Sequence, residues 1–180
     1  MIYIEIAWRN GWICRFSAAR LGQSINDTAD FFRSILDVSM VDSNGVSVSS
    51  DRIEMSAVLS GLAAENIEAA TRADVKLRVL RSKRIIRSDR VLLETTIQNL
   101  LSNAIRQAPG SRGLLGVRMR KGQLAVGIHD SGPGITSDVI PHIFEEFYRG
   151  SEDSTGAGLG LSIVQRVAGI LSVDVKLKSC

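Results

Sequence analysis

The clearest pattern of apolar and polar positions is a helical one in the middle of the chain. Between residues 90 and 108, apolar residues recur at helical spacing and form one face, made of Leu93, Ile97, Leu100, Leu101, Ala104 and Ala108. Ser88-Asp89 suits an N-cap, and Pro109-Gly110 ends the pattern. We therefore predict a helix over residues 90–108.

The opposite side of this helix carries an unusual polar group. At about 100° per residue, Asn99, Asn103 and Arg106 fall together there. Asparagine is a poor helix former, so two of them one turn apart need a reason. Amide oxygens suit Mg²⁺, and an arginine can reach phosphate. The pattern alone leaves a second interpretation open, in which these residues are simply solvated.

A longer seam lies upstream. Apolar and small residues alternate at spacings of three and four over residues 18–39, namely Ala18, Leu21, Ile25, Thr28, Phe32, Ile35 and Ser39. This heptad pattern fits a helix that packs on its own domain, or half of a helical hairpin that dimerises. Residues 1–16 follow no pattern that assigns an element.

The remaining elements follow from alternation, helical stripes and turn residues. We predict a strand over 46–53, a helix over 55–71, strands over 75–79, 85–86, 114–120, 123–128 and 173–177, and an apolar helix after residue 160. Lys121-Gly122 is a turn pair, so 114–120 and 123–128 should form a hairpin. Strands 75–79 and 85–86 should form a second, solvated hairpin.

Composition narrows the class of protein. The 180 residues have 44% apolar and 23% charged content, which is typical of one soluble globular domain with a short appendage. A net charge of +3 does not indicate nucleic acid, and the basic residues between 78 and 90 have no interleaved aromatic residue for base stacking. No run approaches the about 20 apolar residues that span a bilayer. Cys14 and Cys180 have no metal-ligand spacing, so we expect a reduced, cytoplasmic chain.

Two glycine clusters suggest a nucleotide site. Asp130-Ser-Gly132-Pro-Gly134 follows a predicted strand, and Gly156-Ala-Gly158-Leu-Gly160 opens the last helix, where an anion is favoured. The dinucleotide fingerprint fails, because Ile163 occupies the position of its third glycine. The P-loop also fails, because Leu161-Ser162 follows the cluster in place of Lys-Ser/Thr.

Four stretches in order carry a resemblance to a known family. They are Asn99-Leu-Leu-Ser-Asn103-Ala, Asp130-Ser-Gly-Pro-Gly134, Ile143-Phe-Glu-Glu-Phe147-Tyr-Arg149 and Gly156-Ala-Gly-Leu-Gly160-Leu. This order resembles the N box, first glycine box, F box and second glycine box of sensor histidine kinases, within the superfamily shared with gyrase, Hsp90-type chaperones and MutL-type proteins.

The resemblance implies an α/β (α+β) two-layer sandwich of the Bergerat type, with a mixed sheet carrying helices on one face. Residues 46–180 would be the ATP-binding catalytic domain. Residues 17–45 resemble the second helix of a dimerisation and phosphoacceptor hairpin, and residues 1–16 stay unassigned.

The resemblance also implies site roles. Asp130 would accept a hydrogen bond from the adenine amino group, and Asn103 would ligate Mg²⁺ with Asn99 close to the metal and phosphates. Arg106 would contact phosphate. Residues 135–157 would be a mobile lid over ATP. The remaining contacts would come from Gly132 and Gly134 at the base, Gly158, Gly160 and Leu161 at the phosphates, and Phe144 and Phe147 as apolar anchors of the lid.

The sequence departs from the family at three points. Gln107 replaces an aromatic residue of the N box. The family's last strand should follow Ser179 and is missing, so we expect strand 173–177 to be an unpaired edge. The phosphorylated histidine is also missing, since His129 is expected at a strand end and His142 in the lid.

The function implied is that of the MgATP-binding catalytic domain of a two-component sensor histidine kinase, which transfers the γ-phosphoryl to a histidine supplied elsewhere. Implied partners are ATP or ADP, a histidine-bearing dimerisation domain, a response regulator and a second copy through residues 18–39. Alternatives are a degenerate nucleotide-binding or regulatory module, an ATPase switch of the same superfamily, and a serine kinase of anti-sigma type. In the superfamily's ATPases a glutamate stands at the position of Asn99.

Overall fold

The computed structural model describes residues 2–8, 48–120, 123–149 and 158–179. Its elements are β1 (Ile2–Trp8), β2 (Asp51–Glu54), α2 (Met55–Glu65), α3 (Ile67–Arg72), β3 (Lys76–Val79), β4 (Ile85–Ser88), α4 (Arg90–Gln107), β5 (Arg112–Arg120), β6 (Gln123–Asp130), the 3₁₀ helix η1 (Ile140–His142), α5 (Gly160–Ile170) and β7 (Val173–Ser179). The predicted heptad helix over 18–39 and both cysteines lie outside the described residues.

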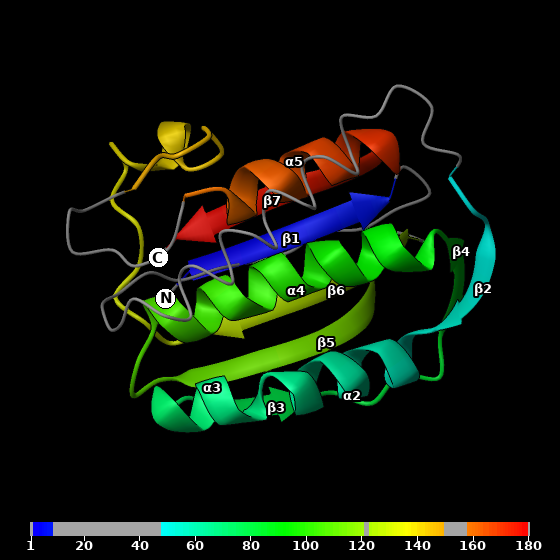
Figure 1. Cartoon of the computed structure of the whole chain (residues 1–180), viewed down its shortest axis with the longest axis horizontal. Coiled ribbons are helices and arrows are strands. Elements are labelled where there is room, and N and C mark those ends of the chain that lie inside the picture. Colours follow the sequence, from blue (N-terminus) through cyan, green and yellow to red (C-terminus); the bar gives the residue numbers. More distant parts are fainter. Residues whose placement is uncertain (1, 9–47, 121–122, 150–157, 180) are drawn as a thin grey trace.

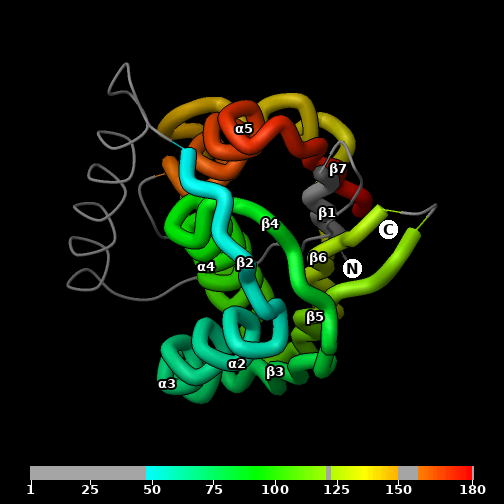
Figure 2. The backbone as a smooth tube through the Cα atoms, turned by 90° about the vertical axis from the view of Figure 1, so that its right-hand side faces the viewer, coloured from blue at the N-terminus to red at the C-terminus, as the bar shows by residue number. Residues whose placement is uncertain are grey.

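The structure is a two-layer sandwich, as predicted. Five strands form one sheet in the order β3-β5-β6-β1-β7, and β2 pairs with β4 in a separate two-stranded sheet. The large sheet is mixed, because β3 runs parallel to β5 while the other neighbours are antiparallel. Helices α2, α4 and α5 lie on the same face of this sheet (Figures 1 and 2).

The core lies between these helices and the sheet. All six residues of the apolar face predicted over residues 90–108 are buried, and all but Ala108 share one core cluster with residues of the central strands such as Leu115, Val126 and Ile128. Removing this much apolar surface from water is the main stabilising term of such a domain. The helix therefore fixes its polar side, with Asn99 and Asn103, relative to the end of β6.

Asp89 begins α4, in agreement with the predicted cap. Its Oδ1 accepts a hydrogen bond from the backbone N–H of Leu92 at 3.0 Å. Its Oδ2 accepts two more, from the N–H and the hydroxyl of Ser49 at 2.9 and 3.0 Å. The carboxylate thus ties the start of the helix to the segment that leads into β2.

The hairpin of β5 and β6 is also as predicted, with pairs from Gly113↔Asp130 to Arg120↔Gln123. Side chains alternate between the two faces of a strand. Ile128 is fully buried towards the helices, so His129 projects from the other face and Asp130 returns to the helical side. This alternation decides on which face the candidate site can lie.

The predicted hairpin of residues 75–79 with 85–86 is wrong. β3 pairs with β5, and β4 pairs antiparallel with β2. Leu77 and Val79 pack against the core, and the N–H of Leu80 donates to the carbonyl of Leu115 at 2.8 Å. The basic residues of this region indicated a solvated hairpin. Burial of Leu77 and Val79 against the core instead favours the pairing of β3 with β5.

The helix predicted over 55–71 is interrupted at Asn66. Its side-chain Nδ2 donates to the carbonyl of Leu62 and to Oε1 of Gln98 in α4, both at 2.7 Å. Asparagine bonds readily to nearby backbone, which competes with helix continuation. The bond to Gln98 anchors the junction of α2 and α3 on α4.

The expectation that strand 173–177 is left unpaired is also wrong, although β7 is the last strand in the order and so remains an edge of the sheet. β1 lies between β6 and β7 and pairs with β7 over seven residues, from Ile2↔Ser179 to Trp8↔Val173. It pairs with β6 from Tyr3↔His129 to Ala7↔Ala125. Residues 2–8, which the sequence analysis left unassigned, therefore form the strand that pairs with β7.

Candidate functional site

Asp130 lies at the last position of β6 and is only 3% exposed. Its Oδ1 accepts a hydrogen bond from the N–H of Gly132 at 2.6 Å, which fixes the rotamer of the carboxylate. A carboxylate held in this way at the helical side of a sheet is suited to accept a hydrogen bond from an amino group of a ligand.

The turn after Asp130 bends at Gly134, whose φ is +94°. Such a φ favours glycine strongly over any residue with a side chain. The turn then ends at Ile135, whose N–H donates to the hydroxyl of Ser179 at 2.8 Å. Sequence reasoning missed Ser179, because its partner lies 44 residues away and on a different element.

Asn99 brings α4 into contact with the start of α5. Its Nδ2 donates to the carbonyl of Thr95 at 2.9 Å, which leaves Oδ1 directed towards Gly160. A Cβ at Gly160 would lie 3.2 Å from this oxygen. The structure thus brings a predicted N-box residue next to a predicted phosphate-loop glycine, and a side chain at Gly160 would require the Asn99 amide to shift.

Asn103 and Arg106 follow on the same side of α4, and both are half-buried. Within the part of the chain that the structure describes, the side chain of Asn103 makes no hydrogen bond, so its amide oxygen is available to a ligand. No group of three or more His, Cys, Asp or Glu residues suited to a metal occurs among the described residues. Mg²⁺ prefers oxygen ligands and usually keeps several waters. The amide oxygen of Asn103, together with phosphate oxygens and waters, would suit that ion, so the residues present fit it.

The N-terminus of α5 faces the same region. Leu159 precedes the helix and cannot cap it with a side chain, so the first N–H groups have no side-chain acceptor. Free N–H groups and the helix dipole favour an anion there. Leu161, a predicted phosphate contact, lies in the first turn and is half-buried, whereas Ser162 and Ile163 behind it are buried.

Gly158 and Phe147 join the lid to this helix start. The N–H of Phe147 donates to the carbonyl of Gly158 at 3.1 Å. Arg166 of α5 also forms an ion pair with Glu146 of the lid. The predicted lid, in yellow in Figure 1, is therefore joined to α5 and the residues before it through Glu146 and Phe147.

Phe147 does not act as an apolar anchor in this structure. Its side chain is 63% exposed and its φ is +61°, whereas Phe144 is half-buried and Ile143 is 8% exposed. The anchoring contact of Phe147 comes from its backbone, and the buried apolar residue of the lid is Ile143. The spacing of aromatic residues could not distinguish these roles.

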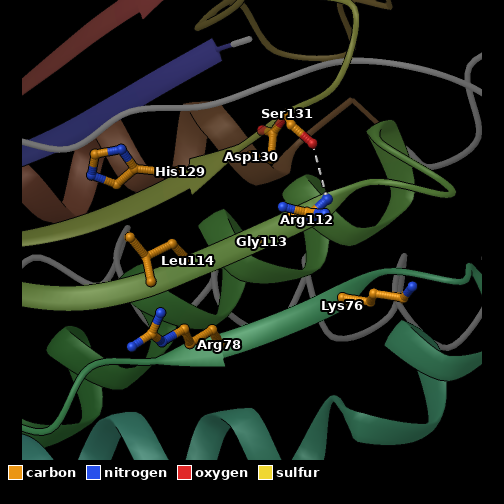
Figure 3. A pocket seen from close by; sticks show the side chains of 8 residues that line it. All are labelled: Lys76, Arg78, Arg112, Gly113, Leu114, His129, Asp130 and Ser131. Carbon is orange, nitrogen blue, oxygen red and sulfur yellow. Dashed lines mark hydrogen bonds between the residues drawn. The ribbon is translucent and has the colours of Figure 1, made fainter.

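A separate hollow of about 390 Å³ opens beside Asp130 on the other face of the sheet (Figure 3). It is lined by Lys76, Arg78, Arg112, Gly113, Leu114, His129, Asp130 and Ser131. Leu77 and Val79 alternate with its cations and face the core, so the hollow lies away from the helices. The hollow therefore does not include Asn99 or Gly160, which lie on the helical side of the sheet.

Comparisons with known proteins identify the family of the chain. Residues 88–179 match the model of a family described as histidine kinase-, DNA gyrase B-, and HSP90-like ATPases. The sensor protein DivL of Caulobacter vibrioides is 30% identical over 168 residues, which are 92% of this chain and 21% of that protein. The chain spans about a fifth to a quarter of the length of the curated relatives it matches.

Solved structures support the same fold. A full-length ShkA structure in complex with AMPPNP has a TM-score of 0.67 at 22% identity and covers 79% of this chain and 31% of that one. The mycobacterial sensor histidine kinase MprB has a TM-score of 0.58 at 27% identity, covering 68% of this chain and 80% of that one. Among the described residues, no helix is both long and apolar enough to cross a membrane.

Proposed function

Because this chain belongs to the family of histidine kinase-, DNA gyrase B-, and HSP90-like ATPases, we propose that it binds MgATP as the catalytic domain of a sensor histidine kinase. It transfers the γ-phosphoryl group to a histidine on another domain. The partners are a histidine-bearing dimerisation domain and a response regulator, and the site of action is the cytoplasm.

The observation that carries this proposal is the buried carboxylate of Asp130. It is fixed by Gly132 on the same side of the sheet as Asn99 and the uncapped start of α5. An acceptor at one end and N–H groups at the other match the amino group of adenine and the phosphates of ATP. Asp130 accepts a hydrogen bond from the adenine base, and the Gly158–Gly160 segment with the N-terminus of α5 binds the phosphates.

The polar side of α4 lies between these two ends. Asn103 holds Mg²⁺ through its amide oxygen, Asn99 orients the phosphates beside Gly160, and Arg106 supplies positive charge. The metal supplies neutralisation of the phosphate charge when it is bound. Phosphoryl transfer needs mainly such positioning, so no nucleophilic side chain is required of this domain.

The acceptor histidine belongs to another domain. His129 lies within β6, and His142 lies in η1, where its Nδ1 is 2.7 Å from Oε1 of Glu145. Neither lies on a helix that could present an imidazole to the γ-phosphate. We therefore expect no self-phosphorylation of this chain.

Titration calorimetry with MgADP tests the base contact. Asp130→Ala leaves the adenine amino group without its acceptor, which lowers affinity about tenfold to a hundredfold. Asp174→Ala is the control, because Asp174 is exposed on β7 and its side chain forms an exposed ion pair with Lys176 at 3.6 Å, away from Asp130. Equal affinities of Asp130→Ala and the unaltered chain would overturn the assignment.

Incubation with γ-labelled ATP tests the transfer. Acid-labile label should appear only on an added histidine-bearing hairpin. Label on this chain alone would contradict the assignment of His129 and His142. Bound ATP with no label on either partner would favour a degenerate module, and fast release of phosphate would favour an ATPase switch.

A further inference from the structure

β1 is the only link between β7 and the rest of the large sheet among the described strands. In the strand order, β1 separates β6 from β7, and those two strands do not pair with each other. Its registers bring Ile2 opposite Ser179 on one side and Tyr3 opposite His129 on the other. The first residues of β1 therefore lie between the end of β7 and the residue that precedes Asp130.

The end of β7 in turn holds the turn after Asp130. Ser179, in β7, accepts a hydrogen bond from the N–H of Ile135 at 2.8 Å. Ile135 packs against the core and directly follows Gly134, whose positive φ sets the direction of the turn. The other end of the turn is fixed by the bond from Gly132 to Asp130. The turn is thus held on β6 through Asp130, on β5 through the bonds between Ser131 and Arg112, and on β7 through Ser179.

The distance between the attachment on β6, at Asp130, and the attachment on β7, at Ser179, depends on β1. Adjacent strands lie about 4.8 Å apart, so one inserted strand sets the separation of β6 from β7 at about 10 Å. Loss of β1 pairing would leave β7 without its neighbouring strand, held among the described residues only by α5 and the single bond to Ile135, and would allow Ser179 to move. The second half of the turn, from Gly134 to Ile135, would then lose its attachment to β7, and with it the fixed approach of Gly134 to a base.

We propose that Ser179 is a positioning residue of the nucleotide site and that the N-terminal strand β1 is a structural part of that site, because it holds Ser179 at the distance the Asp130–Ile135 turn requires. This rests on the proposed function, since the ligand of the turn is the adenine of ATP. It makes nucleotide affinity depend on residues 2–8, which lie far in sequence from every motif of the site.

The first test compares variants of Ser179 by MgADP titration and amide hydrogen exchange. Ser179→Ala should weaken binding about two- to tenfold and speed exchange at Ile135, because that N–H loses its acceptor. Ser179→Thr keeps the hydroxyl and should restore both readouts. Ser56→Ala is the matched control, since the Ser56 hydroxyl is exposed and bonds only Glu54 beside it.

The second test interrupts β1. Ile4 pairs with Ile128 on one side and Leu177 on the other, so Ile4→Pro removes an N–H from an interior strand. Binding should fall at least as far as in Ser179→Ala, with faster exchange at Ile135, while amides of α4 such as that of Ile97 keep their protection. Lost protection at Ile97 would mean that β1 supports the whole fold and would overturn its specific role at the turn.

The outcomes separate this proposal from the function on which it rests. No MgADP binding by the unaltered chain would overturn both. Normal binding by that chain, with unchanged affinity in Ser179→Ala, would overturn only the role of Ser179. Faster exchange at Ile135 without weaker binding would mean that the bond holds the turn but that nucleotide binding does not need it, and it too would overturn the proposal.

Discussion

Gly158 and Phe147 approach so closely that a Cβ on Gly158 would lie 2.7 Å from the carbonyl carbon of Phe147 and 2.8 Å from its Cα. Real Cβ atoms do not come this near to backbone atoms, and the φ of Gly158 is +71° as well. The contact between the lid and the start of α5 therefore requires glycine for two independent reasons.

Gly158→Ala should break this contact. The left-handed backbone costs about 1–3 kcal/mol, and the clash is relieved only if Phe147 moves away. We expect nucleotide affinity to fall more than the melting temperature does, as measured by titration and calorimetric scanning. Gly169→Ala is the control, because a Cβ there meets nothing within 4 Å and adds helix propensity. Equal behaviour of the two variants would contradict the expected clash.

ATP hydrolysis should be slow in the absence of an acceptor. The amide of Asn99 has no basic lone pair at neutral pH, so it can orient a group but cannot take a proton from water. A missing general base typically costs about 10²–10⁴ in rate. Asn99→Ala should weaken MgATP binding and leave the slow hydrolysis at saturating ATP unchanged, as followed by phosphate release. Abolished hydrolysis in this variant would mean that Asn99 takes part in the reaction with water.

Stability should depend on Asp89 in a pH-dependent way. Burial alone would raise the pKa of Asp89, but hydrogen bonds from Leu92, Ser49 and Val91 outweigh it and hold the pKa below the ordinary 3.8. The stabilisation is therefore complete above about pH 4 and is lost as the pH falls through the lower, folded-state pKa.

Urea unfolding at several pH values measures this effect. At pH 7, Asp89→Ala should be about 1–2 kcal/mol less stable than the unaltered chain, and the difference should shrink as the pH falls well below 3.8. Asp89→Asn keeps an acceptor for the Leu92 N–H but cannot ionise, so it controls for the charge. A difference independent of pH would assign the effect to the cap geometry alone.

The amides of Asn66 and Gln98 form a reciprocal pair, with Nδ2 to Oε1 at 2.7 Å and Nε2 to Oδ1 at 3.2 Å. Asn66 is 5% exposed, so its polar atoms depend on this partner and on the Leu62 carbonyl. Asn66→Ala should cost about 1–3 kcal/mol and Gln98→Ala less. A double-mutant cycle in urea should give a coupling of about 1 kcal/mol, and additive effects would rule out a coupled pair.

Local signals explain most of what the sequence predicted correctly. The apolar face of α4, the cap at Asp89 and the hairpin of β5 with β6 each depend on residues close together in the chain. The bends at Gly134 and Gly158 followed from the same kind of signal, since glycine is strongly preferred at a positive φ.

Long-range pairing explains the failures. β3 and β4 were assigned to each other because they are neighbours in sequence, yet each pairs with a strand from elsewhere. β1 has Ile2, Ile4 and Ile6 at the alternate spacing of a strand, but β6 and β7, the strands it pairs with, lie far away in the sequence, so no nearby signal supported its assignment. The bond of Ser179 with Ile135 depends on β1 and was therefore beyond reach as well.

The position of β1 also sets an order of events during synthesis of the chain. β1 leaves the ribosome before every other element described, but its partners β6 and β7 are among the last to emerge. The helices α2 and α4 and the β5–β6 hairpin can associate while β1 still has one partner missing. The large sheet is complete only when Val173–Ser179 has left the ribosome. A ribosome stalled before that point would carry β1 with one unpaired edge, which could pair with other nascent chains.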